Sequence, residues 1–235
     1  MLAQIILLTM GAYILGSVPT SYIAGRLLKG IDIRDYGSGV VSGTNVWHSV
    51  SRWAVVPVGI ADVLKGFIPV YIAWAAGLTL LDEAILAQGV VGLAAIIGHS
   101  WSIFLRFGGG RGISTMMGAL TVIAHWELLV FVGIWLLGIA FINSPIGALI
   151  AETALPLVSW GFGEPLALTL CLMAMSLLLI AKRLIANEGL SAFTRERRQV
   201  LLCRLLLDRD AFDREAWIYR SVADLKQHRE KRKEN

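Results

Sequence analysis

Residues 53–81 read WAVVPVGIADVLKGFIPVYIAWAAGLTLL, and Asp62 and Lys65 are the only charged residues among them. A helix needs about 20 apolar residues to cross the hydrocarbon core of a bilayer, so this stretch is long enough to span one. Only 16% of the whole chain is charged, which is below the level of about 25% typical of soluble domains. We therefore expect an all-α, polytopic membrane helix bundle with spans at 2–25, 53–81, 84–105, 112–126, 128–142, 145–160 and 165–181.

The number of spans depends on two long apolar regions that could each form one helix or two. Glu127 interrupts the region 112–142, and a stretch from Gly161 to Pro165 interrupts the region 145–181. We favour two helices in each region, which gives seven spans, whereas merging both pairs would give five.

The distribution of lysine and arginine predicts the orientation, because cytoplasmic loops are enriched in both residues. With the N-terminus outside, the loop 26–52, Arg106, Arg111 and the C-terminal tail all lie in the cytoplasm. An even number of spans would place the basic tail outside. The first 25 residues have no basic segment of the kind that opens a secretory signal, so we expect a retained span.

The chain divides into a transmembrane domain at 1–185 and a basic, helical cytoplasmic tail at 186–235. From residue 182 onward there are fourteen Lys and Arg against nine Asp and Glu, whereas earlier residues carry seven against eight. A basic tail after apolar spans favours the anionic leaflet over nucleic acid as its partner.

Cys171 and Cys203 have no CxxC spacing, and no metal or cofactor is expected.

Two glycine-rich loops break the apolar pattern on the predicted cytoplasmic side. The first reads YGSGVVSGTN at 36–45, and the second reads GGGRGIST at 108–115. Glycine lets backbone N–H groups approach a ligand closely, and a helix N-terminus after the loop favours an anion. Arg106 and Arg111 add guanidinium groups suited to phosphate, so we expect a phosphate site here.

Ionisable residues within or beside the spans are further candidates, because such groups are costly in a membrane. His99 could act as a general base or hold substrate, or it could simply bond to a backbone carbonyl. Asp62 and Lys65 share a helix face, where they could neutralise one another or Lys65 could reach a phosphate. The chain has no HxxxxD, GxSxG, GxxxxGK[ST] or HExxH motif, which argues against several other enzyme classes.

Four stretches together resemble a known family. They are GSVPTSY at 16–22, SGVVSGTNV at 38–46, DVLKGFIPV at 62–70 and the segment 98–115. In order and spacing they are similar to the SGNxGATN, DxxKGxxPV and GHxxxxFLxFxGGKGxAT motifs of the acyl-phosphate-dependent glycerol-3-phosphate acyltransferases of bacteria, the PlsY type. The resemblance covers about residues 16–118.

This resemblance implies that a fatty acyl phosphate donates its acyl group to the 1-hydroxyl of glycerol-3-phosphate. The products would be lysophosphatidic acid and phosphate, in the first step of phospholipid synthesis at the inner membrane. No covalent acyl-enzyme is implied. The implied catalytic residues are His99 and Ser38, and the implied substrate-binding residues are Thr44, Asn45, Lys65, Arg106, Gly109, Gly110, Arg111, Gly112 and Thr115.

Several positions depart from the family pattern. Val40 replaces an asparagine, His48 a basic residue, and Gly108 and Arg111 two lysines, while a late Arg-His-x-x-Asn element is blurred within 182–187. These changes leave open a catalytically diverged member that binds lipid phosphates. A small anion transporter is a weaker alternative, because no internal repeat is visible. The sequence does not predict the oligomeric state or the acyl-chain preference.

Overall fold

The computed structural model describes residues 1–36, 39–185, 197–209 and 212. Within these residues the protein consists of α-helices, short 3₁₀ turns and connecting loops, which confirms the all-α prediction. The elements are α1 (Leu2–Ser17), α2 (Thr20–Lys29), η1 (Ile33–Asp35), α3 (Gly43–Ser49), α4 (Val55–Ala75), α5 (Ala84–Ser100), η2 (Ile103–Leu105), α6 (Ile113–Ile123), α7 (His125–Phe141), α8 (Ser144–Gly161), α9 (Leu166–Ile185) and α10 (Arg197–Leu207).

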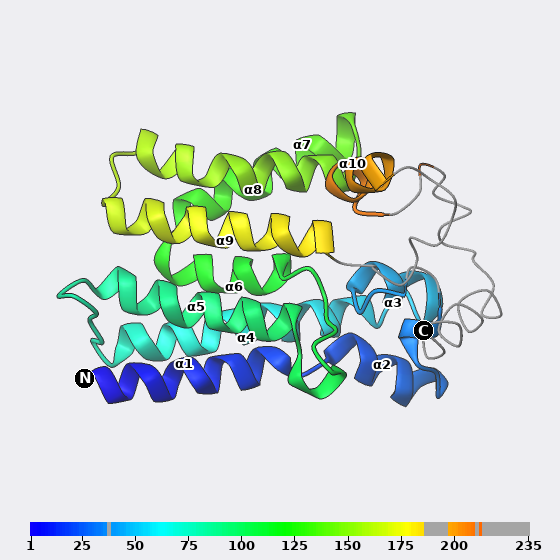
Figure 1. Ribbon diagram of the computed structural model, residues 1–235, viewed down its shortest axis with the longest axis horizontal. Helices are drawn as coiled ribbons and strands as arrows, with labels where there is room; N and C mark the ends of the chain where they lie inside the picture. The colour runs from blue at the N-terminus through cyan, green and yellow to red at the C-terminus, as the bar shows by residue number, and fades with distance from the viewer. Residues whose placement is uncertain (37–38, 186–196, 210–211, 213–235) are drawn as a thin grey trace.

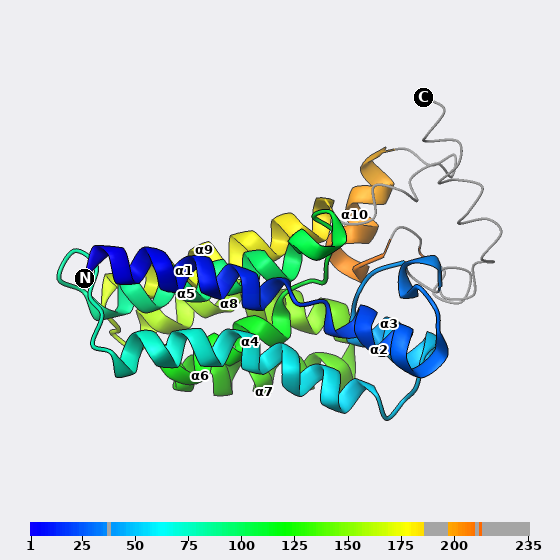
Figure 2. The ribbon, with the colours of Figure 1, turned by 90° about the horizontal axis from the view of Figure 1, so that it is seen from below.

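Seven of these helices, α1 and α4 to α9, lie side by side along the long axis of the molecule (Figures 1 and 2). Thr79, beyond the end of α4, contacts the sulfur of Met1 at the end of the bundle where the chain begins. At the opposite end the Tyr13 hydroxyl donates to the Trp101 carbonyl at 3.0 Å. That opposite end also carries α2, α3, the loop 101–112 and α10, and we refer to it as the polar end.

Glycine allows α4 and α6 to pack with their backbones in contact. A Cβ atom at Gly66 would collide with the Thr115 carbonyl oxygen, and one at Gly118 would collide with the Val63 carbonyl oxygen. In a membrane, lipid tails are as apolar as leucine side chains, so helices associate through close packing and not through the hydrophobic effect. Small residues at the interface make this close packing possible. Glycines make equally close contacts in the α1–α5 and α7–α8 pairs, at Gly16, Gly98, Gly138 and Gly147.

The outside of the bundle is apolar, as a lipid-facing surface requires. Large side chains such as Leu7, Leu129, Leu137, Leu157 and Leu177 are exposed on four different helices. A soluble monomer rarely exposes so much apolar surface, whereas a membrane helix satisfies its backbone internally and presents such side chains to lipid.

The helix boundaries support the two-helix interpretation of both ambiguous regions. The chain breaks at Ala124, between α6 and α7, and again after Gly161, between α8 and α9. The first break is three residues before Glu127, where it was predicted, and Glu127 is instead buried in the first turn of α7. The span predicted at 2–25 corresponds to the apolar stretch Leu2–Lys29, but this stretch is not one continuous helix, because α1 ends before Val18-Pro19 and α2 begins after it. Proline has no N–H to donate and its ring disfavours a continuous helix.

Membrane spanning is indicated most strongly for three helical stretches that are long and apolar enough by length and composition. They are Leu2–Lys29, Val55–Ala75 and Leu166–Ile185, and α5, α6 and α7 are apolar but shorter. Seven spans, with the N-terminus outside and the C-terminus inside, stay predictions.

Replacing Gly118 by leucine is expected to destabilise the bundle, because the new side chain would overlap the backbone of α4. Overpacking of this kind costs about 1–3 kcal/mol or more. The thermal unfolding midpoint in detergent measures the effect. The matched control is Gly133→Leu, since a Cβ at the exposed Gly133 meets nothing within 4 Å. Equal midpoints for the two variants would contradict the proposed α4–α6 contact.

Candidate functional site

A small pocket lies at the polar end, where the junction of α1 and α2 meets α4, α5 and the second glycine loop. Four of the predicted site residues line it: Lys65, His99, Gly109 and Gly110. The rest of the lining comes from Ser17, Val18, Pro19, Thr20, Ser21, Val41, Ser102 and Leu105. The fold thus brings together segments that are up to 93 positions apart, from Ser17 to Gly110.

A buried carboxylate binds two of the residues that line this pocket. Asp62 Oδ1 accepts hydrogen bonds from Lys65 Nζ at 2.6 Å and from Thr20 Oγ1 at 2.6 Å. Lys65 Nζ also donates to Thr20 Oγ1 at 3.1 Å, and the side chain of Lys65 is only 4% exposed. Lys65 is therefore paired with Asp62, as one of its two interpretations expected, and it also lines the pocket, while its contact with a phosphate stays a prediction.

His99 lies between this carboxylate and the glycine loop. Its Nδ1 atom is 3.6 Å from Asp62 Oδ1. On the other side, a Cβ atom at Gly110 would collide with His99 Nε2, and the Gly110 N–H donates to the His99 carbonyl at 3.1 Å. A carboxylate near Nδ1 favours a proton on that nitrogen, which leaves Nε2 able to accept one.

The second glycine loop needs its glycines because it runs against the end of α5. A Cβ atom at Gly109 would collide with the carbonyl oxygens of His99 and Ser100. Gly112, at φ +90°, has the left-handed backbone that precedes α6 and that side-chain-bearing residues rarely adopt. Gly109 and Gly110 therefore sit at the pocket because no side chain would fit there.

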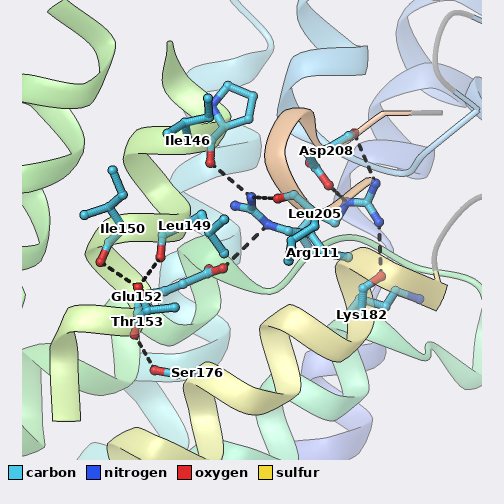
Figure 3. A network of polar contacts seen from close by, with 12 residues as sticks. Arg111, Ile146, Leu149, Ile150, Glu152, Thr153, Ser176, Lys182, Leu205 and Asp208 are labelled. Atoms are coloured by element: carbon cyan, nitrogen blue, oxygen red, sulfur yellow. Dashed lines mark hydrogen bonds and ion pairs between the residues drawn. The ribbon is translucent and has the colours of Figure 1, made fainter. Parts of the chain in front are cut away.

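Other residues of the second loop lie elsewhere. Thr115 is fully buried against α4, and Arg106 is exposed. Arg111 is 8% exposed, and its Nε atom is 2.7 Å from Asp208 Oδ1, beyond the end of α10 (Figure 3). Among the described residues, the pocket lining includes none of these three and not Gly112. Their predicted contacts with substrate stay predictions.

The first glycine loop is held by Asn45. Its Nδ2 atom lies 3.0 Å from each of the carbonyl oxygens of Ile33, Tyr36 and Val40, to which it donates. Its Oδ1 atom accepts from Ser49 Oγ at 2.9 Å. The Asn45 amide thus stabilises the loop in this structure, while its predicted role as a substrate ligand is untested.

Two further predicted residues, Ser38 and Thr44, belong to the first loop. Thr44 is not among the described residues that line the pocket. Thr44 is exposed at the start of α3, and Ser38 lies outside the described residues. The predicted catalytic role of Ser38 and the predicted binding role of Thr44 therefore remain predictions.

An ion pair stabilises the connection between α2 and the first glycine loop. Asp32 Oδ2 accepts from Arg34 Nη2 at 2.6 Å, and Asp32 Oδ1 accepts from the Arg34 backbone N–H at 3.0 Å. Burial alone would raise the pKa of Asp32, but these bonds from Arg34 outweigh it and hold the pKa below its ordinary value. The pair therefore stabilises the loop at neutral pH, and this contribution is lost as the pH falls through the lowered pKa of Asp32.

Sequence reasoning predicted the pairing of Asp62 with Lys65, but it missed Thr20 and His99 as neighbours of that carboxylate. Both stood in stretches that it singled out, but nothing local to the sequence places Thr20 on α2 against a carboxylate on α4. Among the described residues, no group of three or more His, Cys, Asp or Glu is arranged to hold a metal ion.

Comparison with known proteins gives a consistent result. The family model described as Glycerol-3-phosphate acyltransferase matches residues 6–187. The protein named glycerol-3-phosphate acyltransferase 5 of Dehalococcoides mccartyi is 34% identical over 224 residues, covering 93% of this chain and 94% of the relative. A glycerol-3-phosphate acyltransferase of Endomicrobium trichonymphae is 37% identical over 171 residues, covering 72% of this chain and 82% of the relative.

Two solved structures share the fold. Both are crystal structures of PlsY (YgiH), an integral membrane glycerol 3-phosphate acyltransferase. The glycerol 3-phosphate form matches with a TM-score of 0.69 and 28% identity, and the lysophosphatidic acid form with 0.67 and 27%. Each match covers 77% of this chain and 88% of the solved one.

The structural role of Asn45 can be tested by replacing it with alanine. The variant leaves buried carbonyl groups without a donor, which costs about 1–3 kcal/mol for such a group, so the thermal unfolding midpoint should fall. Thr44→Ala is the matched control, because Thr44 is an exposed neighbour on the same helix. An Asn45→Ala protein as stable as Thr44→Ala would show that the amide does not hold the loop.

Proposed function

We propose that this chain, which belongs to the glycerol-3-phosphate acyltransferase family, transfers a fatty acyl group to glycerol-3-phosphate and produces lysophosphatidic acid. The observation that carries the proposal is the pocket at the polar end, where Lys65 and His99 lie beside Gly109 and Gly110. Lys65 supplies a cation, His99 a potential base, and Gly109 and Gly110 a backbone without side chains. A site for an anionic substrate with a reacting hydroxyl group requires such a combination.

The acyl donor in this proposal is an acyl phosphate, a mixed anhydride with a good leaving group. The 1-hydroxyl oxygen of glycerol-3-phosphate attacks the acyl carbonyl carbon, and the bond from that carbon to the phosphate oxygen breaks. The hydroxyl proton passes to His99 Nε2, and inorganic phosphate leaves. Because the donor is already reactive, orientation and charge stabilisation suffice without a covalent acyl-enzyme.

Each group in the pocket has a distinct part in this mechanism. The Lys65 ammonium donates a hydrogen bond to the substrate phosphate, and Asp62 and Thr20 hold that ammonium in place. Gly109 and Gly110 let the substrate phosphate approach the backbone. The Asp62 carboxylate near Nδ1 stabilises His99 when its ring gains a proton.

The membrane setting follows from the same proposal. The chain is an integral membrane protein, and we place its polar end at the cytoplasmic face of the inner membrane, with seven spans. Arg26, Lys29, Arg34 and Arg52 lie in or beside α2 and α3 at this end, as the positive-inside rule favours. A soluble acceptor from the cytoplasm and a membrane-dissolved donor can meet there.

A second candidate function is lipid-phosphate binding without catalysis. Val40, which stands where the family has asparagine, is buried, and its carbonyl oxygen is taken by Asn45. Arg111, in place of a family lysine, is engaged with Asp208. These two observations favour a diverged site, and the assay below separates the two functions.

The test is to incubate the purified full chain with palmitoyl phosphate and glycerol-3-phosphate and to follow phosphate release and lysophosphatidic acid formation. We expect transfer by the wild-type protein, and a loss of about 100-fold or more in kcat for His99→Ala, the range typical of a general base. The matched control is His125→Ala, because His125 is exposed at the opposite end of the bundle.

The outcomes decide between the two functions. If folded wild-type protein binds palmitoyl phosphate but transfers no palmitoyl group above the buffer rate, the binding function is established instead. Equal activity of the His99→Ala and His125→Ala proteins would refute the assigned base while leaving the reaction itself intact.

A further inference from the structure

The helix α10 lies beyond the part of the chain that the family model matches, which ends at residue 187. It packs against α8 and α9 at the polar end (Figure 1). Its side chains Val200, Cys203 and Arg204 are buried. An element outside the family match is therefore attached to the end of the bundle that carries the pocket.

Two arginines from the bundle bind the C-terminal end of α10. Arg183 Nη1 donates to the Leu205 carbonyl oxygen at 3.0 Å, and Arg111 Nη2 donates to the Asp208 carbonyl oxygen at 3.4 Å. The last carbonyl groups of a helix lack partners within the helix and carry partial negative charge, so cations are favoured there. In the reverse direction Arg204 Nη1 donates to the Leu184 carbonyl oxygen at 2.9 Å, near the end of α9.

Arg111 is held more firmly than an ordinary surface residue. In addition to the ion pair with the Asp208 carboxylate at 2.7 Å, it donates to the Lys182 carbonyl oxygen at 3.2 Å (Figure 3). Exposed ion pairs contribute little to stability, but the Arg111 side chain is only 8% exposed. Removing one partner of a buried pair leaves the other charge uncompensated, which makes the contact costly to break.

The backbone of Arg111 belongs to the glycine loop itself. Its neighbour Gly110 lines the pocket and donates to the His99 carbonyl oxygen. The loop is therefore anchored at two successive residues, by Gly110 to α5 on one side and by Arg111 to α10 on the other. Glycine-rich backbone has little stiffness of its own, so these anchors decide its shape.

We propose that Asp208 is a positioning residue of the site, which through Arg111 holds Gly109 and Gly110 in the conformation that binds the substrate phosphate. The C-terminal helix α10 is then part of the acyltransferase site and not only an appended tail. The kinetic test of this inference, a KM measurement, rests on the function proposed above. The structural test, hydrogen exchange of the loop amides, rests on the loop geometry alone.

The kinetic test compares the full-length wild-type chain with Asp208→Asn. We expect the KM for glycerol-3-phosphate to rise about tenfold, as for the loss of one charge-assisted hydrogen bond, with kcat little changed. Asp208→Glu keeps the charge and should restore the wild-type KM. Asp82→Asn is a matched control, because Asp82 (φ 64°) and Asp208 (φ 54°) both have left-handed backbones and Asp82 is exposed at the other end of the bundle.

The structural test measures hydrogen exchange of the backbone amides of residues 108–112 by mass spectrometry in the same proteins. Faster exchange in Asp208→Asn than in Asp82→Asn is expected, and it does not depend on turnover. Unchanged exchange, or a lower unfolding midpoint with an unchanged KM, would overturn the positioning role. A wild-type chain without transfer activity would refute the proposed function separately, and the exchange result would still decide whether Asp208 positions the loop.

Discussion

The carboxylate of Asp62 is the point at which three elements of the fold meet. One of its oxygens accepts hydrogen bonds from Thr20 on α2 and Lys65 on α4, and lies near His99 on α5. A charge within a membrane helix is costly unless it is paired and hydrogen-bonded, so the three elements must keep this arrangement for the fold to be stable. The same arrangement holds Lys65 and His99 at the pocket.

Close backbone packing makes this network possible. Gly66, which follows Lys65, lies against the backbone of α6, and Gly110 lies against the His99 ring. A side chain at either position would push α6 or the glycine loop away from the charged groups. Helix association and site geometry therefore depend on the same small residues, as expected where lipid leaves no hydrophobic drive for helix contact.

A second set of charges ties the C-terminal part of the chain to the bundle. Glu152 on α8 is fully buried, and its carboxylate is 3.5 Å from Arg183 Nε on α9. Arg183 in turn binds α10, as Arg111 does from the glycine loop (Figure 3). Sequence reasoning placed Arg111 at a phosphate, because Arg111 and Asp208 are 97 positions apart and leave no local pattern that predicts their contact. The same holds for Glu152 and Arg183, which are 31 positions apart.

The amino-acid sequence by itself determined the apolar helices and the loop after Gly161, because hydropathy and helix-breaking residues act over a few neighbouring positions. It also predicted a break between α6 and α7, but it placed that break at Glu127, three residues after its actual position at Ala124. Its motifs also identified Lys65, His99, Gly109 and Gly110, which do meet at one pocket. Only the tertiary structure decided that Thr20 binds the Asp62 carboxylate and that Arg111 turns toward α10. It also showed that the Asn45 amide binds its own loop. The physical reason is that a polar side chain takes whichever partner the packed helices bring within reach, and that choice is made between helices, not along the chain.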